Sequence, residues 1–192
     1  MTSESIAVTL QVIDVLEALG VPYAIGGSLA SALHGMARAT LDSDLVADLQ
    51  PTQVPAFVHQ LQEQFYVDEM VVANAIQRHT SFNLIHLETM FKVDIFIPKE
   101  RPFDQAQLAR RQAHKVATDP ERTAYVASAE DTILAKLEWY RLGGEQSERQ
   151  WRDIRGVVQV QGDRLDYEYV SQQAAVLGVT DLWQKMLSEL SL

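Results

Sequence analysis

The 192-residue sequence contains no cysteine, which excludes disulfide bonds and metal sites with thiolate ligands. It also lacks any apolar run near the roughly 20 residues that a helix needs to cross a bilayer. Its first residues have neither the basic nor the apolar region of a secretory signal. We therefore expect a protein without a membrane span that works in the cytoplasm.

Basic residues are scarce as well: 16 Lys and Arg stand against 26 Asp and Glu, a formal net charge of −10. This balance argues against a general nucleic-acid coat protein, which uses excess positive charge to displace counterions. Residues 1–100 hold 4 basic and 12 acidic residues, and residues 101–192 hold 12 and 14. The basic residues of the second half have two interpretations, a local anion-binding surface or a solvated surface of mixed charge.

The arrangement of apolar residues predicts an α+β protein. Helical and strand patterns alternate over residues 1–127, which we expect to form a small mixed sheet flanked by helices. Residues 128–192 are helical in pattern throughout and are expected to pack on that core. A hydrophobic content of 47% is typical of a chain that buries a core.

Local patterns define the individual elements. Helices are expected over 5–19, 29–36, 51–65 and 103–112, and strands over 21–25, 41–49, 81–87, 91–97 and, at the sheet edge, 123–126. In the second half, Ser128 is expected to cap a helix that ends at Gly143-Gly144. Three more helices follow, around 151–158, 166–177 and 180–190.

Gly26-Gly27-Ser28 lies between a predicted strand and a predicted helix. Glycines allow a sharp turn and a close ligand approach, and the free N–H groups of a helix start favour phosphate. An ordinary turn explains the tripeptide equally well. It matches neither the P-loop nor the dinucleotide fingerprint.

Asp42 and Asp44 lie two residues apart in a predicted strand, so both project from one face. Adjacent carboxylates repel each other unless a cation offsets them or both face water. Mg²⁺ is a suitable cation, since it takes one or two carboxylates together with phosphates. Asp94 is a further acid in a very apolar strand. If that strand lies beside residues 41–49, the three carboxylates share a surface that can hold two metal ions.

Taken together, these motifs resemble the nucleotidyltransferase superfamily. The likeness rests on Gly26-Gly27-Ser28, on Arg38-Ala39-Thr40-Leu41-Asp42-Ser43-Asp44-Leu45, and on Asp94 in a later strand. The Arg-x-Thr-x-Asp-x-Asp run is similar to that of the AbiEii-type group of abortive-infection and toxin–antitoxin nucleotidyltransferases. The likeness continues through Ser128-Ala129-Glu130-Asp131, Ala135-Lys136-Leu137 and Arg152-Asp153-Ile154, and so covers residues 10 to 160. Ser43 departs from the usual apolar residue between the two acids.

The resemblance implies a role for each matching residue. Gly27 and Ser28 would hold the nucleotide's phosphates, and Asp42, Asp44 and Asp94 would bind Mg²⁺ or Mn²⁺. Asp94 would also help to activate the attacking hydroxyl. The remaining implied roles concern triphosphate binding by Lys136, a further functional acid at Asp153, and orientation of the loop before the metal strand by Arg38 and Thr40.

The residues alone leave alternatives open in the helical half. Lys136 also fits a solvated position beside the buried stripe, and Asp153 also fits an ion-pair partner of nearby arginines. His34 is close enough in sequence to the glycine turn to reach the site, although a core or capping role also fits. The five histidines show no zinc spacing, and the three tryptophans fit packing positions.

We therefore expect a Mg²⁺-dependent enzyme that transfers a nucleoside monophosphate from an NTP to an acceptor hydroxyl. The resemblance implies a toxin acting on RNA with an antitoxin partner, while a protein or small-molecule acceptor stays open. The alternative is a non-catalytic nucleotide- or metal-binding module that acts through a protein partner. Kinase-like transfer is disfavoured because the Walker lysine and the His-Arg-Asp loop are missing.

Overall fold

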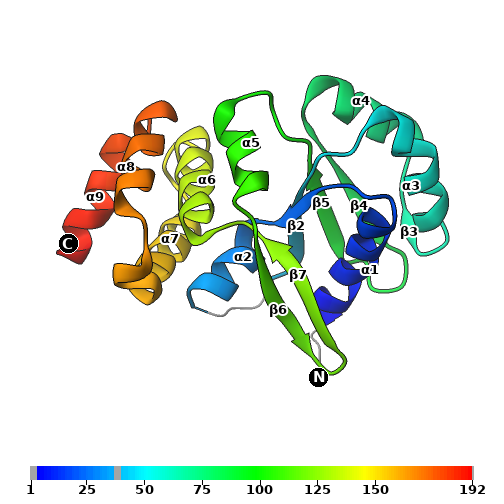
Figure 1. Ribbon diagram of the computed structural model, residues 1–192, viewed down its shortest axis with the longest axis horizontal. Coiled ribbons are helices and arrows are strands. Elements are labelled where there is room, and N and C mark those ends of the chain that lie inside the picture. Colours follow the sequence, from blue (N-terminus) through cyan, green and yellow to red (C-terminus); the bar gives the residue numbers. More distant parts are fainter. Residues whose placement is uncertain (1–3, 37–39, 192) are drawn as a thin grey trace. The chain divides into compact units, whose positions relative to one another are not determined.

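The structure, a computed structural model, describes residues 4–36 and 40–191 (Figure 1). Arg38 of the predicted site lies outside the described residues. The chain forms two compact units. We call residues 4–26 and 40–126 the sheet unit, and residues 27–36 and 127–191 the helical unit.

The sheet unit is built around a seven-stranded mixed sheet with the order β3-β4-β5-β2-β1-β7-β6. β2 pairs with β5 in parallel and with β1 antiparallel, and β1 pairs with β7 in parallel. The other neighbours pair antiparallel. The strands are β1 (Tyr23–Ile25), β2 (Asp42–Ala47), β3 (Phe65–Tyr66), β4 (Ser81–His86), β5 (Lys92–Phe96), β6 (Gln112–Thr118) and β7 (Glu121–Val126).

Alternating residues of β2 and β5 divide the sheet between a core face and a polar face. Ser43, Leu45, Val93 and Ile95 are fully buried, whereas the acids between them are partly exposed. Helix α1 contacts β2 and buries an apolar stripe of its own. The helices of this unit are α1 (Glu4–Ala18), the short 3₁₀ turn η1 (Pro51–Gln53), α3 (Val54–Leu61), α4 (Glu69–Arg78) and α5 (Pro102–Ala109).

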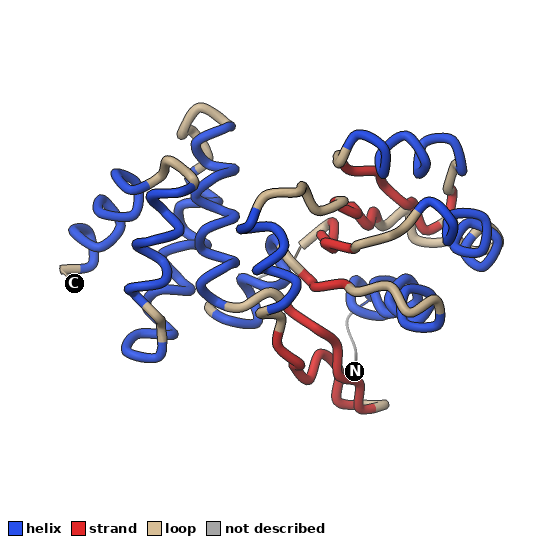
Figure 2. The backbone as a smooth tube through the Cα atoms, turned by 45° about the horizontal axis from the view of Figure 1, so that its top comes forward, coloured by secondary structure: helices blue, strands red, loops and turns tan. Residues whose placement is uncertain are grey.

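Helices alone make up the helical unit (Figure 2). They are α2 (Gly27–His34), α6 (Ala129–Leu142), α7 (Glu148–Gln161), the 3₁₀ turn η2 (Gly162–Arg164), α8 (Tyr167–Val176) and α9 (Thr180–Leu190). The Ser128 side chain accepts a hydrogen bond from the N–H of Asp131, which confirms the predicted cap. α2 packs on α6 and α7. A Cβ at Gly35 would lie 2.8 Å from the backbone nitrogen of Val157, so only glycine permits this approach.

The predicted α+β class is confirmed, and most predicted elements are found within a few residues of their expected bounds. Four expectations are wrong in detail. Strand 123–126 is not at the edge, because β6 pairs beyond β7, and the helix expected to reach residue 112 ends at Ala109. Phe65 belongs to β3 instead of the preceding helix, and α2 already begins at Gly27. Helix α4 was not anticipated.

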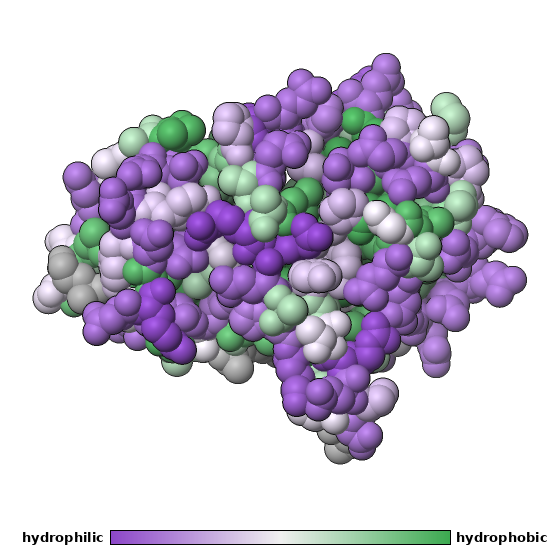
Figure 3. All heavy atoms as spheres, viewed as in Figure 1, coloured by the Kyte–Doolittle hydropathy of each residue, from purple (hydrophilic) through white to green (hydrophobic). Residues whose placement is uncertain are grey.

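Hydrophilic residues cover most of the face drawn in Figure 3. Within the described part of the chain, none of the helices has the length and apolar character needed to span a bilayer.

Candidate functional site

Parallel pairing of β2 with β5 brings the predicted carboxylates together. Asp44 lies directly opposite Asp94 in the register, and Asp42 lies opposite Lys92. Since side chains alternate along a strand, all four residues project from the polar face of the sheet. The arrangement expected for Asp42, Asp44 and Asp94 is therefore present in the sheet unit.

Lys92 adds a positive charge to this face, and its place beside Asp94 was not among the expected site features. Its Nζ lies 2.7 Å from Oδ2 of Asp94, and the two side chains are 43% and 17% exposed. The hydrogen bond to Asp94 raises the pKa of Lys92, and the charges of Asp94, Asp42 and Asp44 act in the same direction against partial burial. Lys92 is far from Asp42 in sequence, so its position beside the acids of β2 becomes visible only with the pairing of β2 and β5.

Residues around Asp42 hold the start of β2 in place. The Thr40 hydroxyl lies 2.9 Å from the Asp42 carbonyl oxygen and 3.0 Å from its Oδ1, so it restricts the orientation of the carboxylate. The role predicted for Thr40, orientation of the loop before the metal strand, stays a prediction. Ser43 is fully buried, and its hydroxyl lies 2.9 Å from that of Thr9 in α1. This hydrogen bond explains how a polar residue is accommodated between the two acids.

Carboxylate oxygens are the ligands that Mg²⁺ and Mn²⁺ prefer. Among the described residues, however, no three His, Asp or Glu side chains are close enough to one another to hold a metal ion. One oxygen of Asp94 instead contacts the Lys92 ammonium group. Carboxylate oxygens suit a divalent ion in their donor chemistry, but the Lys92 ammonium group already lies against Asp94. Metal binding by the three acids stays a prediction.

The glycine turn joins the two units in sequence. The N–H of Gly26 donates to the carbonyl oxygen of Asp44 at 2.8 Å, which extends the pairing of β1 with β2. Gly27 begins α2 with a φ of +53°, a conformation that favours glycine. The next residue, Ser28, is buried, and Nη2 of Arg149 lies 3.3 Å from its hydroxyl oxygen. A guanidinium group beside a helix start is a suitable contact for phosphate.

Lys136 and Asp153, both predicted site residues, pair with each other. Nζ of Lys136 in α6 lies 2.9 Å from Oδ2 of Asp153 in α7, and the two side chains are only 9% and 7% exposed. The alternative of a solvated Lys136 is therefore wrong, as is that of a surface ion pair at Asp153. Burial makes this contact part of the packing between the two helices.

His34 has a structural position in the helical unit. It is buried, and its Nε2 lies 2.7 Å from the carbonyl oxygen of Ala127. The core role considered for this residue agrees with that contact. Arg149 is the functional candidate that sequence reasoning did not separate from its neighbours Arg152 and Arg155.

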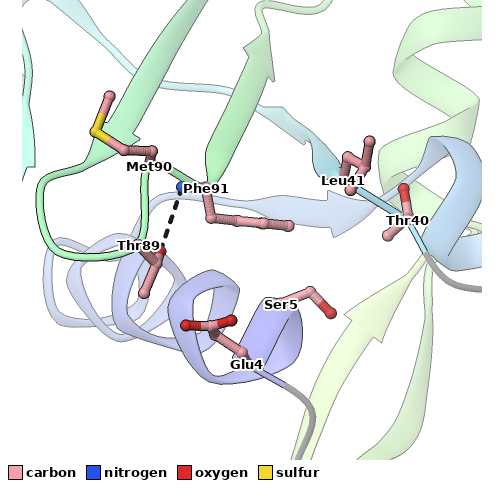
Figure 4. Close-up of a pocket in the computed structure, with 7 residues that line it drawn as sticks. All are labelled: Glu4, Ser5, Thr40, Leu41, Thr89, Met90 and Phe91. Atoms are coloured by element: carbon pink, nitrogen blue, oxygen red, sulfur yellow. Dashed lines mark hydrogen bonds between the residues drawn. The ribbon is translucent and has the colours of Figure 1, made fainter.

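A pocket of about 450 Å³ lies in the sheet unit beside the start of β2 and β5 (Figure 4). Thr40 and Leu41 line it directly before Asp42, and Phe91 lines it directly before Lys92. Its lining combines apolar side chains with hydroxyl groups and one carboxylate. The complete set is Glu4, Ser5, Thr40, Leu41, Thr89, Met90 and Phe91.

No protein-family model matches the sequence, and no curated protein matches it. The structure is similar to that of an antigenic nucleotidyltransferase-like protein from Paracoccidioides brasiliensis, with a TM-score of 0.59 and 19% identity over 98% of this chain and 93% of that one. The chain has the fold of the nucleotidyltransferases.

Two further similar structures are enzymes that act on antibiotics. The lincosamide antibiotic adenylyltransferase LnuA, with lincomycin bound, has a TM-score of 0.52 and 18% identity over 83% of this chain and 98% of that one. ANT(2'')-Ia in complex with adenylyl-2''-tobramycin has a TM-score of 0.52 and 13% identity over 91% and 97%. These likenesses show the fold alone. Membership of the nucleotidyltransferase superfamily and of its AbiEii-type subgroup stays a prediction.

Proposed function

We propose that the chain is a nucleotidyltransferase that moves a nucleoside monophosphate from an NTP to an acceptor hydroxyl with the help of Mg²⁺ or Mn²⁺. The observation that carries this proposal is the register of β2 with β5. It sets Asp44 beside Asp94, with Asp42 on the same face, within a nucleotidyltransferase fold. Divalent ions at such carboxylates stabilise the charge that develops on the attacking and leaving oxygens.

In the proposed reaction, the acceptor oxygen attacks the α-phosphorus. The bond between the α-phosphorus and the bridging oxygen to the β-phosphate breaks, and pyrophosphate leaves with the electron pair. Asp94 accepts the hydroxyl proton in this proposal, because its carboxylate lies on the same face as Asp42 and Asp44 and is 17% exposed. Thr40 keeps the Asp42 carboxylate in one orientation.

The nucleotide contacts expected of Ser28, Lys136 and Asp153 stay predictions, and all three residues belong to the helical unit. In this proposal the Ser28 hydroxyl and the N–H groups at the start of α2 donate hydrogen bonds to a phosphate, and Arg149 adds a guanidinium group beside Ser28. Lys136 is the predicted triphosphate contact, and binding there requires it to exchange its Asp153 partner for a phosphate oxygen. Arg38 keeps its predicted orienting role.

A small-molecule acceptor is the second candidate within the same reaction class. The pocket beside Asp42 presents hydroxyl groups next to Leu41, Met90 and Phe91, which suits a compact acceptor with polar and apolar parts. The structures of LnuA and ANT(2'')-Ia hold small molecules, lincomycin and adenylyl-2''-tobramycin. RNA or protein acceptors, the toxin role, the antitoxin partner and the cytoplasmic location stay predictions.

The rival from another class is a nucleotide- or metal-binding module without catalysis. A third carboxylate on the same face favours the enzyme, because binding alone does not need a group that takes up a proton. The two proposals differ in one measurable respect, which is the fate of the α-phosphate.

Incubation with α-³²P-labelled NTPs, Mg²⁺, cellular RNA and a set of small hydroxylated acceptors tests the proposal. We expect label on an acceptor, and we expect Asp44→Ala to lower its rate at least about 10³-fold, equivalent to about 4 kcal/mol. Asp48→Ala is the matched control, since it removes an acid just beyond the other end of β2. Equal labelling by Asp44→Ala would refute the metal site, and Mg²⁺-dependent NTP binding with no transfer would favour the binding module.

A further inference from the structure

The polar face of β2 and β5 holds four charged side chains in a compact square. Asp42 and Asp44 lie on one strand, and Lys92 and Asp94 occupy the matching positions on the other. Neighbouring strands are about 4.8 Å apart, and alternate residues of one strand are about 6.6 Å apart. Lys92 therefore has a carboxylate at each of the other three corners, and all three raise its pKa.

Neighbours on the next strand add no charge. β4 places Asn83 beside Asp94 and Ile85 beside Lys92. Among the described residues of β2 and β5, three carboxylates and one ammonium group sum to two negative charges on this face. One divalent ion is enough to neutralise them, and a second ion would give the face a surplus of positive charge unless Lys92 moved away or an anion entered.

Lys92 has the freedom to move. Its side chain is 43% exposed, and one partly exposed ion pair links it to Asp94, which is 17% exposed. A pair that water reaches on the lysine side contributes little to stability. A triphosphate would bring the compensating negative charge, and the long lysine side chain can then turn toward solvent or toward a phosphate oxygen.

We propose that Lys92 is a built-in counter-cation that blocks metal binding by Asp94 until a nucleoside triphosphate enters the site. This inference rests on the proposed function. It adds that the carboxylates bind a divalent ion weakly without nucleotide, and that the nucleotide's charge relieves the competition.

Titration with Mn²⁺, followed by the electron paramagnetic resonance signal of free Mn²⁺, measures the competition without any turnover. In the absence of nucleotide, we expect Lys92→Met to bind Mn²⁺ at least about tenfold more tightly than the parent, because a like charge has been removed from the site. With a non-hydrolysable triphosphate present, we expect the difference to shrink below about threefold.

Two variants separate a local effect from a change in net charge. Lys92→Arg keeps the positive charge and is expected to bind Mn²⁺ like the parent. Lys115→Met removes a lysine from the ion pair with Glu121 on β6 and β7, in the same unit, and is also expected to bind like the parent. Tighter binding by either control, or no tightening in Lys92→Met, would overturn the inference. If Lys92 only stabilised the fold, Lys92→Met would bind Mn²⁺ more weakly than the parent. That result would also overturn the inference.

Asp44→Ala in the parent and in Lys92→Met distinguishes the two levels of the proposal. If Asp44→Ala removes Mn²⁺ binding while Lys92→Met leaves it unchanged, the metal site stands and the counter-cation role fails. If Asp44→Ala changes nothing in either background, the metal site itself is wrong.

Discussion

In the sheet unit, Lys92 is 43% exposed and meets Asp94 on a strand face, whereas in the helical unit Lys136 and Asp153 meet between two helices with side chains 9% and 7% exposed. The two pairs join the same groups at nearly the same distance, 2.7 and 2.9 Å. Their surroundings differ. Water can replace either partner of the exposed pair, but it cannot readily reach the buried one.

This difference separates two uses of an ion pair. An exposed pair adds little to stability and can exchange its partners with ions or phosphates at low cost. A buried pair adds little net stability when intact, yet it costs several kcal/mol when only one partner is removed. We therefore expect substitutions in the sheet unit to change ligand binding and substitutions in the helical unit to change folding.

The largest effect on stability is expected from Asp153→Ala. The substitution leaves the Lys136 ammonium buried without its partner, so we expect the free energy of unfolding to fall by about 3–5 kcal/mol. Urea unfolding followed by circular dichroism measures it. A loss below about 1 kcal/mol would place this pair in the same class as Lys92 and Asp94 and remove the contrast between the units.

The double variant Lys136→Met/Asp153→Leu sharpens that result. Replacing both partners by apolar side chains of similar volume is expected to recover most of the lost stability, because no buried charge remains. If Lys136 also contacts the triphosphate, the double variant folds but binds NTP more weakly. Recovery of both stability and NTP affinity would make Lys136 purely structural.

Gly35→Ala is expected to lower the free energy of unfolding by about 1–3 kcal/mol, because position 35 lies where α2 meets α7. A Cβ at Gly35 would lie 2.8 Å from Val157 N and 2.9 Å from Gly156 C, both backbone atoms that cannot move aside without shifting a helix. Gly35→Ala should therefore lower the midpoint of urea unfolding.

Gly156→Ala is the matched control for this contact. Its Cβ would meet Met36 at 3.5 Å, an ordinary contact, and alanine is the better helix former. We expect no loss of stability. If both alanine variants unfold at the same urea concentration, the close approach at Gly35 does not limit the packing of α2.

The sequence was sufficient to predict which carboxylates share a face, because strand alternation is a local property. Asp42 and Asp44 are two residues apart, and Asp94 stands out as an acid among Val93, Ile95 and other apolar neighbours. The parallel pairing that brings Asp94 beside Asp44 was an assumption, and the structure supports it. Lys92 lies two residues before Asp94 on the same strand face, so their pairing is local, whereas its position opposite Asp42 depends on a register that no local pattern determines.

Elements with a weak apolar pattern were missed or misplaced. β6 buries only Val116 and Ala117 among its seven residues, so alternation could not reveal it, and β7 was taken for the edge. Helix α4 has a usable signal, since Asp68 caps it and Val72, Ala75 and Ile76 follow helical spacing. The burial of Lys136 with Asp153 depends on the packing of α6 against α7, which sequence periodicity does not specify.

The smallest effect is expected from Asp44→Asn on stability. Asp44 and Asp94 are register partners, so an amide at position 44 removes a repulsion between adjacent carboxylates at nearly constant volume. We expect the free energy of unfolding at pH 7 to stay equal or to rise by up to about 1 kcal/mol. The gain should shrink in 1 M salt, because screening weakens interactions between exposed charges. Urea unfolding at low and high salt measures both values. A loss similar to that of Asp153→Ala would mean that Asp44 is held as a structural group, and the sheet unit would then resemble the helical unit in how it uses charge.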